Sequence, residues 1–215
     1  ATLSRLRGRQ VGLFFEELMA FWLEHQSTYK LLARNLQVRE QGRTLGAFDF
    51  ILQTPELQFE HWELTVKFYL QRSSSLDWDA WVGPNGRDRL DIKMARMADH
   101  QLPLSLTDTG RQALHELGVE DDICRRAVLK GIFFSEWESE PRFPHDANIN
   151  NEKGVWVRQS GVKRFAQQYA SSFFVNRQKP DWLAPLHLSF EDAAAAGEWA
   201  DQLKDVPLDG GVMVS

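Results

Sequence analysis

The chain has 215 residues, of which 43% are hydrophobic and 26% are charged, proportions that are typical of a globular protein. Its net charge of −5 argues against a protein that coats nucleic acid through many Lys and Arg contacts to phosphates. The single cysteine, Cys124, excludes an intramolecular disulfide and a zinc cage built from several thiolates.

The sequence contains no membrane or export signal. No stretch approaches the roughly 20 apolar residues that span a bilayer, and the N-terminal "ATLSRLRGRQ" lacks the hydrophobic core of a signal peptide. We therefore expect a cytoplasmic protein with no membrane partner. At this length we expect one domain over residues 1–215, with residues 205–215 as a tail.

The first 70 residues predict one helix followed by three strands. Apolar residues at helical spacing predict a helix from Arg9 to His25. The segments "YKLLARNLQVR" and "TLGAFDFIL" predict two antiparallel strands, because the intervening "EQGR" is typical of a tight turn. After a loop that contains Pro55, "HWELTVKFYLQ" predicts a third strand.

The rest of the chain mixes helices and strands. A helix is expected from about Asp88 to Gln101, ended by Pro103, with Gln101 on an otherwise apolar face. The later expected elements are a short helix in "TDTGRQALHELG", a strand in "RRAVLKGIFFSEW", short strands in "VWVRQ" and "SSFFVNRQ", a helix around "VKRFAQQY", and a terminal helix in "SFEDAAAAGEWADQLKD" capped by Ser189. This order predicts an α/β (α+β) fold with a mixed central sheet flanked by helices.

Ionisable residues stand on the two strands with the most apolar composition. Side chains alternate along a strand, so Glu63, Thr65 and Lys67 share one face of the third strand. Asp49 lies in the preceding strand. If the two strands are neighbours, the carboxylates of Asp49 and Glu63 converge on one surface of the sheet.

Two neighbouring carboxylates suit Mg²⁺ or Mn²⁺, which take oxygen ligands and keep waters that a phosphate can share. A lysine beside such a metal can orient a water nucleophile and stabilise charge on phosphorus. The pattern therefore predicts phosphodiester hydrolysis. The alternative is that Glu63 and Lys67 are solvated side chains on the open face of a sheet.

The order of these segments resembles a known nuclease pattern. "GLFFEEL", with Gly12 and Glu16, is followed by "GAFD" and then by "ELTVK". This order resembles the PD-(D/E)XK nuclease-like superfamily, in which a helix with a Glu precedes a strand with an Asp and a strand with an acid and a Lys. Over residues 5–185 the chain more closely resembles an uncharacterised bacterial family, a domain of unknown function assigned to that superfamily.

The resemblance implies a restriction-endonuclease-like fold, formed as a single nuclease-like domain that lacks an N-terminal segment present in family members. It implies that Asp49 and Glu63 bind Mg²⁺ or Mn²⁺, that Glu16 completes the site and that Lys67 positions the attacking water. Nucleic acid, DNA rather than RNA, is the partner it implies.

The chain departs from the superfamily in its acid and lysine spacing. The usual separation is one residue, about 6.6 Å of strand, whereas Glu63 and Lys67 are four positions apart, about 13 Å. Either Lys67 keeps the usual place and Thr65 has replaced the acid, or Glu63 is the acid and the lysine has migrated. The displaced lysine and the acidic pI are also compatible with a catalytically inactive member that binds nucleic acid or a protein.

A second acid and lysine pair and a second glutamate compete with these candidates. "LDIKM" places Asp91 two residues before Lys93, but residues i and i+2 of a helix point apart, so a solvated helix face is the favoured interpretation. Glu17 is the alternative to Glu16, and the spacing from Gly12 favours Glu16.

Overall fold

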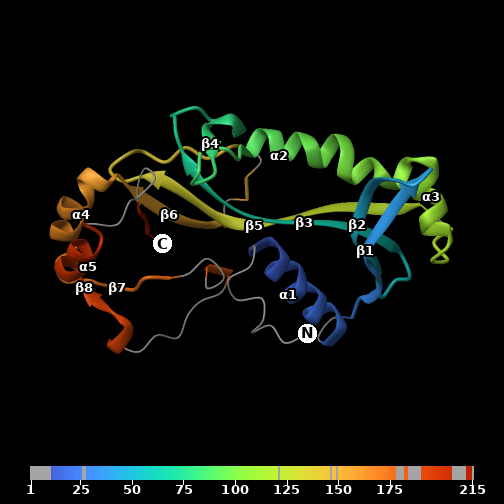
Figure 1. Ribbon diagram of the computed structural model, residues 1–215, viewed down its shortest axis with the longest axis horizontal. Coiled ribbons are helices and arrows are strands. Elements are labelled where there is room, and N and C mark those ends of the chain that lie inside the picture. The colour runs from blue at the N-terminus through green and yellow to red at the C-terminus, as the bar shows by residue number, and fades with distance from the viewer. Residues whose placement is uncertain are drawn as a thin grey trace. The chain divides into compact units, whose positions relative to one another are not determined.

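The computed structural model of the chain describes residues 11–25, 28–120, 122–145, 147–148, 150–177, 182–183, 190–204 and 212–214. These residues confirm the predicted α/β architecture, with a mixed seven-stranded sheet flanked by helices (Figure 1). The chain divides into two compact units: the first unit is Ala1–Val66 with Ile92–Lys130, and the second unit is Lys67–Asp91 with Gly131–Ser215.

The hairpin at the start of the sheet forms where the sequence predicted it. β1 (Lys30–Glu40) and β2 (Arg43–Gln53) pair antiparallel. Gln41 and Gly42 connect them with φ angles of 47° and 81°. Two consecutive residues with positive φ are the signature of a type I′ turn, whose twist matches that of the flanking strands.

The third strand, β3 (Phe59–Gln71), pairs antiparallel with β2. The ladder runs from the pair Gln53 and Phe59 to the pair Phe50 and Trp62. The sequence predicted an apolar face and a polar face for β3. Both faces are in fact buried, and the polar residues on the strand are buried with the apolar ones: Glu60, His61, Glu63, Thr65 and Gln71. A buried strand with this many polar side chains needs partners for them.

The helices of the first unit cover its strands. α1 (Val11–His25) lies beside β1 (Figure 1). The helix expected at Asp88–Gln101 is α2 (Leu90–Arg96), followed by a π-helical turn (Met97–Gln101) and a 3₁₀ segment (Leu102–Leu106) that packs against β2. Pro103 therefore does not end the helical path, because it occupies the first turn of the 3₁₀ segment, where no backbone donor is needed.

The apolar core of the first unit joins the hairpin to the helices. α3 (Asp108–His115) follows Thr107, whose hydroxyl accepts a hydrogen bond of 3.0 Å from the Gly110 backbone. Six buried side chains form the core cluster: Val38, Phe48, Ile51, Leu104, Leu114 and Val119. They hold the 3₁₀ segment and α3 against the strands.

The second unit contains the remaining strands and two short helices. Its elements are β4 (Trp81–Val82), the end of β5 (Ile123–Glu136), β6 (Glu152–Val157), α4 (Val162–Gln168), β7 (Phe173–Phe174), β8 (Ala194–Ala195), α5 (Ala196–Gln202) and β9 (Val212–Val214). β5 and β6 are parallel, and β9 is antiparallel to β6. The segment expected as a tail thus contributes a strand.

The alanine run near the C-terminus does not begin a helix as predicted. Ala194 and Ala195 pair with β7, and α5 starts only at Ala196. The intrinsic helix propensity of alanine is weak, and tertiary strand pairing overrides it. Ser189, the expected cap, lies outside the described residues.

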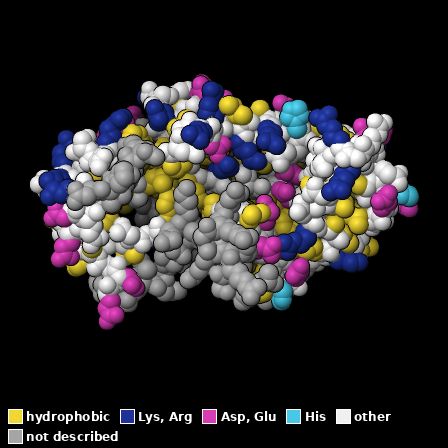
Figure 2. Space-filling view, viewed as in Figure 1, with side chains coloured by type: hydrophobic (Ala, Val, Ile, Leu, Met, Phe, Trp, Pro, Cys, Tyr) yellow, Lys and Arg dark blue, Asp and Glu magenta, His cyan; other side chains and the backbone are white. Residues whose placement is uncertain are grey.

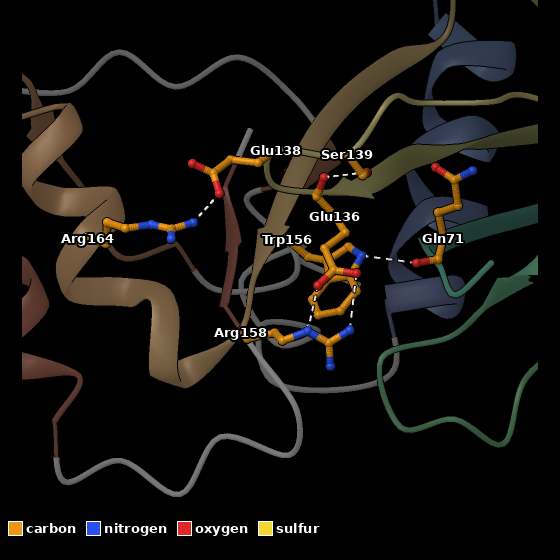
Figure 3. A network of polar contacts seen from close by, with 7 residues as sticks. All are labelled: Gln71, Glu136, Glu138, Ser139, Trp156, Arg158 and Arg164. Atoms are coloured by element: carbon orange, nitrogen blue, oxygen red, sulfur yellow. Dashed lines mark hydrogen bonds and ion pairs between the residues drawn. The ribbon is translucent and has the colours of Figure 1, made fainter. Parts of the chain in front are cut away.

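Polar contacts join β3, β5, β6 and α4 within the second unit (Figure 3). The indole Nε1 of Trp156 donates to the backbone oxygen of Gln71 over 3.1 Å. Arg158 makes two hydrogen bonds to Glu136, of 2.5 and 3.1 Å. Because Glu136 ends β5 and Arg158 follows β6, this ion pair ties the ends of the two parallel strands together.

None of the helices within the described residues combines the length and apolar character that a membrane crossing requires.

Candidate functional site

Asp49 and Glu63 lie where β2 and β3 stop pairing. The ladder between the two strands ends at Phe50 and Trp62, and Asp49 and Glu63 are the next residue on each strand. Beyond this point the backbone N–H of Leu64 donates to Asp49 Oδ2 over 2.7 Å. The Asp49 carboxylate therefore occupies the place of a strand carbonyl. The predicted placement of these two acids on neighbouring strands is confirmed.

Glu63 is buried and hydrogen-bonded through both carboxylate oxygens. Its side chain has no exposed surface. His61 Nε2 lies 2.8 Å from Oε1, and Gln101 Nε2 donates to Oε2 over 2.6 Å. The alternative that Glu63 is a solvated surface residue is therefore wrong. A buried carboxylate needs such donors to offset the loss of hydration.

Glu16 of α1 joins these two acids electrostatically. Burial and then the charge of Glu63 raise the pKa of Asp49 to about 6, against the opposing hydrogen bond from Leu64. The pKa of Glu16 is also raised, first by burial and then by the charge of Asp49. Glu16 is thus coupled electrostatically to Asp49 and Glu63.

Glu17, the alternative to Glu16, lies outside this site. It forms an ion pair with Arg34 on the surface, which includes a hydrogen bond of 3.3 Å. Since the two carboxylates are adjacent on α1, they point in different directions. The preference for Glu16 that the spacing from Gly12 indicated agrees with this geometry.

Lys93 bonds to Gln101, the residue that also donates to Glu63. Lys67 belongs to the second unit, where its ammonium lies 2.5 Å from Asp88 Oδ2. Lys93 Nζ donates to Gln101 Oε1 over 3.1 Å, and the charge of Lys93 lowers the pKa of Asp49. Lys93 is half-buried and bound to Gln101, while Asp91 pairs with Arg89, so "LDIKM" is not a second acid and lysine pair.

Sequence reasoning missed Gln101 and His61 as well as Lys93. The signal for Gln101 was its polar side chain at the end of an otherwise apolar helix face. The π-helical turn Met97–Gln101 changes the rotation of the helix, so a search for 3.6-residue spacing does not place Gln101 correctly. Such turns are rare and are frequent at functional sites.

The carboxylates near the end of the β2–β3 ladder bear on the expected metal. In the part of the chain that the structure describes, no group of three or more His, Cys, Asp and Glu side chains is arranged to hold a metal ion. Mg²⁺, however, is usually held by one or two carboxylates and keeps several waters. Asp49 and Glu63 supply two neighbouring carboxylates, which is the number that such an ion commonly takes from a protein.

The chain matches one protein family over nearly its whole length. The family model described as Domain of unknown function (DUF1853) matches residues 1–213. Searches of curated proteins and of solved structures gave no match. Because the family match spans nearly the full sequence, the chain belongs to the DUF1853 family.

Proposed function

We propose that this DUF1853 protein is a metal-dependent, nuclease-like protein that hydrolyses phosphodiester bonds in nucleic acid. The proposal is carried by one observation, the placement of Asp49 and Glu63 side by side just past the end of the β2–β3 ladder, where burial and the charge of Glu63 raise the pKa of Asp49 to about 6. Ionised carboxylates that repel each other away from water destabilise the fold unless a cation offsets their charge.

Asp49 and Glu63 would hold Mg²⁺ or Mn²⁺, with Glu16 supporting the ion directly or through a water. When bound, the ion would act as a Lewis acid that can polarise a phosphoryl oxygen and lower the pKa of a bound water. Asp49 is held by the Leu64 backbone, and Glu63 is held by His61 and Gln101. Such support keeps the two carboxylates within the narrow range of positions that catalysis tolerates.

Lys93 would orient the attacking water and stabilise the charge that develops on phosphorus. Its ammonium is held by the Gln101 side chain, which also donates to Glu63. Of the two options left by the spacing, this geometry supports Glu63 as the acid with a lysine that has migrated to α2. The order of elements resembles that of the PD-(D/E)XK superfamily, and DNA rather than RNA is the substrate proposed on that resemblance.

The charge distribution suits local rather than general contact with nucleic acid. On the face shown in Figure 2, Lys and Arg side chains are interspersed with acidic side chains. With a net charge of −5, affinity would come from a limited set of phosphate contacts and from the bound ion.

The second candidate function is binding of nucleic acid or a protein without catalysis. One observation favours it: Lys67, the residue in the usual lysine position of the strand, has its ammonium paired with Asp88. If Lys93 does not replace it, the site could bind a metal and a phosphate without activating water.

The experiment is a cleavage assay with Mg²⁺ and with Mn²⁺ on single-stranded, duplex and branched DNA. We expect metal-dependent cleavage that falls by on the order of a hundredfold or more in Asp49→Asn and Glu63→Gln, since each removes a group placed at the reacting centre. Glu24→Gln, at an exposed acid of α1, is the matched control. Metal binding without cleavage would support the inactive alternative, and cleavage undiminished in Asp49→Asn would contradict the site.

A further inference from the structure

His61 is a buried histidine whose hydrogen bonding is settled by its surroundings. Its side chain has no exposed surface, and its Nε2 lies 2.8 Å from Glu63 Oε1. The ring of Phe48 stands edge-on to the imidazole, with ring centroids 4.8 Å apart and planes at 82°. Packing on this side restricts rotation of the imidazole away from Glu63.

The contacts of the two ring nitrogens assign the proton. Nδ1 is buried and has no hydrogen-bond partner within the described part of the chain. A proton on Nδ1 alone would leave a buried donor unpaired and would turn the Nε2 lone pair towards a carboxylate oxygen. A proton on Nε2 instead makes a charge-assisted hydrogen bond. His61 therefore donates to Glu63 through Nε2.

Glu63 receives this donor on one oxygen and the Gln101 amide on the other. The two donors come from β3 and from the π-helical turn, so they fix the carboxylate plane from two separate elements. A carboxylate has about four lone-pair positions, so one position on each oxygen remains for a further partner. The orientation of those remaining positions is set by His61 and Gln101.

We propose that His61 is a positioning residue that holds the Glu63 carboxylate in the orientation needed to bind the divalent ion beside Asp49. The part concerning the ion rests on the proposed function, whereas the direction of the hydrogen bond does not. His61 is not itself a ligand through Nε2, because that nitrogen donates to Glu63. Outer partners that orient a ligand typically change metal affinity by about 10- to 100-fold.

A pair of substitutions at His61 tests the positioning role. His61→Gln carries an amide donor where Nε2 stands, whereas the shorter His61→Asn carries it near the place of Nδ1 and does not reach Glu63. Mn²⁺ affinity of the full chain is measured by calorimetric titration, with thermal unfolding as a check on folding. We expect His61→Asn to bind Mn²⁺ about 10- to 100-fold more weakly than the wild type, and His61→Gln to recover most of that loss.

The control is His115→Gln, at an exposed histidine of α3, which leaves Mn²⁺ affinity unchanged. Equal affinity in the wild type, His61→Asn and His61→Gln would overturn the proposal. Equal weakening in both His61 variants would also overturn it, because the amide that reaches Glu63 would then have restored nothing.

The hydrogen bond itself is tested without metal by ¹⁵N NMR of histidine-labelled protein, with the His61 signals assigned from His61→Gln. We expect a protonated Nε2, and an Nε2 without a proton would overturn the proposal. A wild type that does not bind Mn²⁺ yet has a protonated Nε2 would refute the metal function while leaving the hydrogen bond to Glu63 in place. Failure of the positioning role of His61 can thus be told apart from failure of the proposed metal function.

Discussion

The carboxylate of Asp49 accepts a hydrogen bond of 2.7 Å from the backbone N–H of Leu64, just past the last paired residues of β2 and β3. This contact lets the two strands separate without leaving a buried backbone donor unpaired. It also holds Asp49 beside Glu63, at the cost of placing two like charges together.

Asp49→Asn should stabilise the fold at pH 7 to 8 while abolishing metal binding. An amide oxygen still accepts from Leu64, but the charge that repels Glu63 is gone. The pKa of Asp49 is raised to about 6 from an ordinary value of 3.8, so the folded state binds more protons than the unfolded state between these values. The repulsion between Asp49 and Glu63 therefore lowers the stability of the fold as the pH rises from 3.8 to about 6.

The measurement is the free energy of unfolding from urea titrations at pH 4 and pH 7.5. The stability advantage of Asp49→Asn over the wild type should be present at pH 7.5 and mostly absent at pH 4. Glu24→Gln should show no such pH-dependent difference. If Asp49→Asn is less stable than the wild type at pH 7.5, the charge of Asp49 stabilises the fold, and the prediction is contradicted.

Divalent metal should stabilise the wild type, and less so at low pH. A ligand that binds only the folded state at 100 times its dissociation constant adds about 2.7 kcal/mol to stability. Because burial and neighbouring acids raise the pKa values of Asp49 and Glu16, protons compete with the ion as the pH falls through about 6. Thermal unfolding with and without Mn²⁺ at pH 5 and pH 7.5 measures both effects.

The expected rise in melting temperature is large at pH 7.5 and small at pH 5 in the wild type, and it is missing in Glu63→Gln at both values. A shift of equal size in Glu63→Gln would show that Mn²⁺ binds elsewhere.

Replacing each candidate lysine should separate their roles. Lys93→Met should lower the cleavage rate by on the order of 100- to 1,000-fold, the range seen when one stabilising donor is removed, while Mn²⁺ binding persists. Lys67→Met removes only the ion pair with Asp88 and should retain cleavage. Single-turnover rates at saturating Mn²⁺ are the measurement. The reverse result would return the catalytic role to Lys67.

The β1–β2 turn should depend on glycine for a purely conformational reason. Gly42 has a φ of 81° and open space around a built Cβ, so Gly42→Ala meets no clash. It should still cost about 1 to 2 kcal/mol of unfolding free energy, because an L-residue is strained in this region. Gly42→Asn should lose less, since asparagine tolerates positive φ. Equal stability of all three proteins in urea would contradict this explanation.

Much of the first unit was predictable because its contacts are local. The Gln41–Gly42 turn and the alternating strands on either side determine the hairpin, and the order of segments places Asp49 and Glu63 on neighbouring strands. These features involve residues close in sequence, whose pairing is limited by turn geometry and strand length. Hydrophobic pattern and turn chemistry are sufficient there.

The alanine run at residues 193–196 shows that local pattern is not sufficient everywhere. Composition predicts a helix, yet Ala194 and Ala195 form β8 because a strand partner, β7, is available. The difference in backbone propensity is well under 1 kcal/mol per residue, so hydrogen bonds to a neighbouring strand decide the outcome.

The amino-acid sequence by itself determined the mixed α/β architecture and the strands that carry Asp49 and Glu63. Only the tertiary structure decided that Lys93, Gln101 and His61 complete the surroundings of those acids. The reason is physical: strand neighbours follow from register over a few residues, whereas the partners of a helix side chain depend on how the helix lies across the sheet. A π-helical turn then changes that rotation by an amount no periodic pattern reveals.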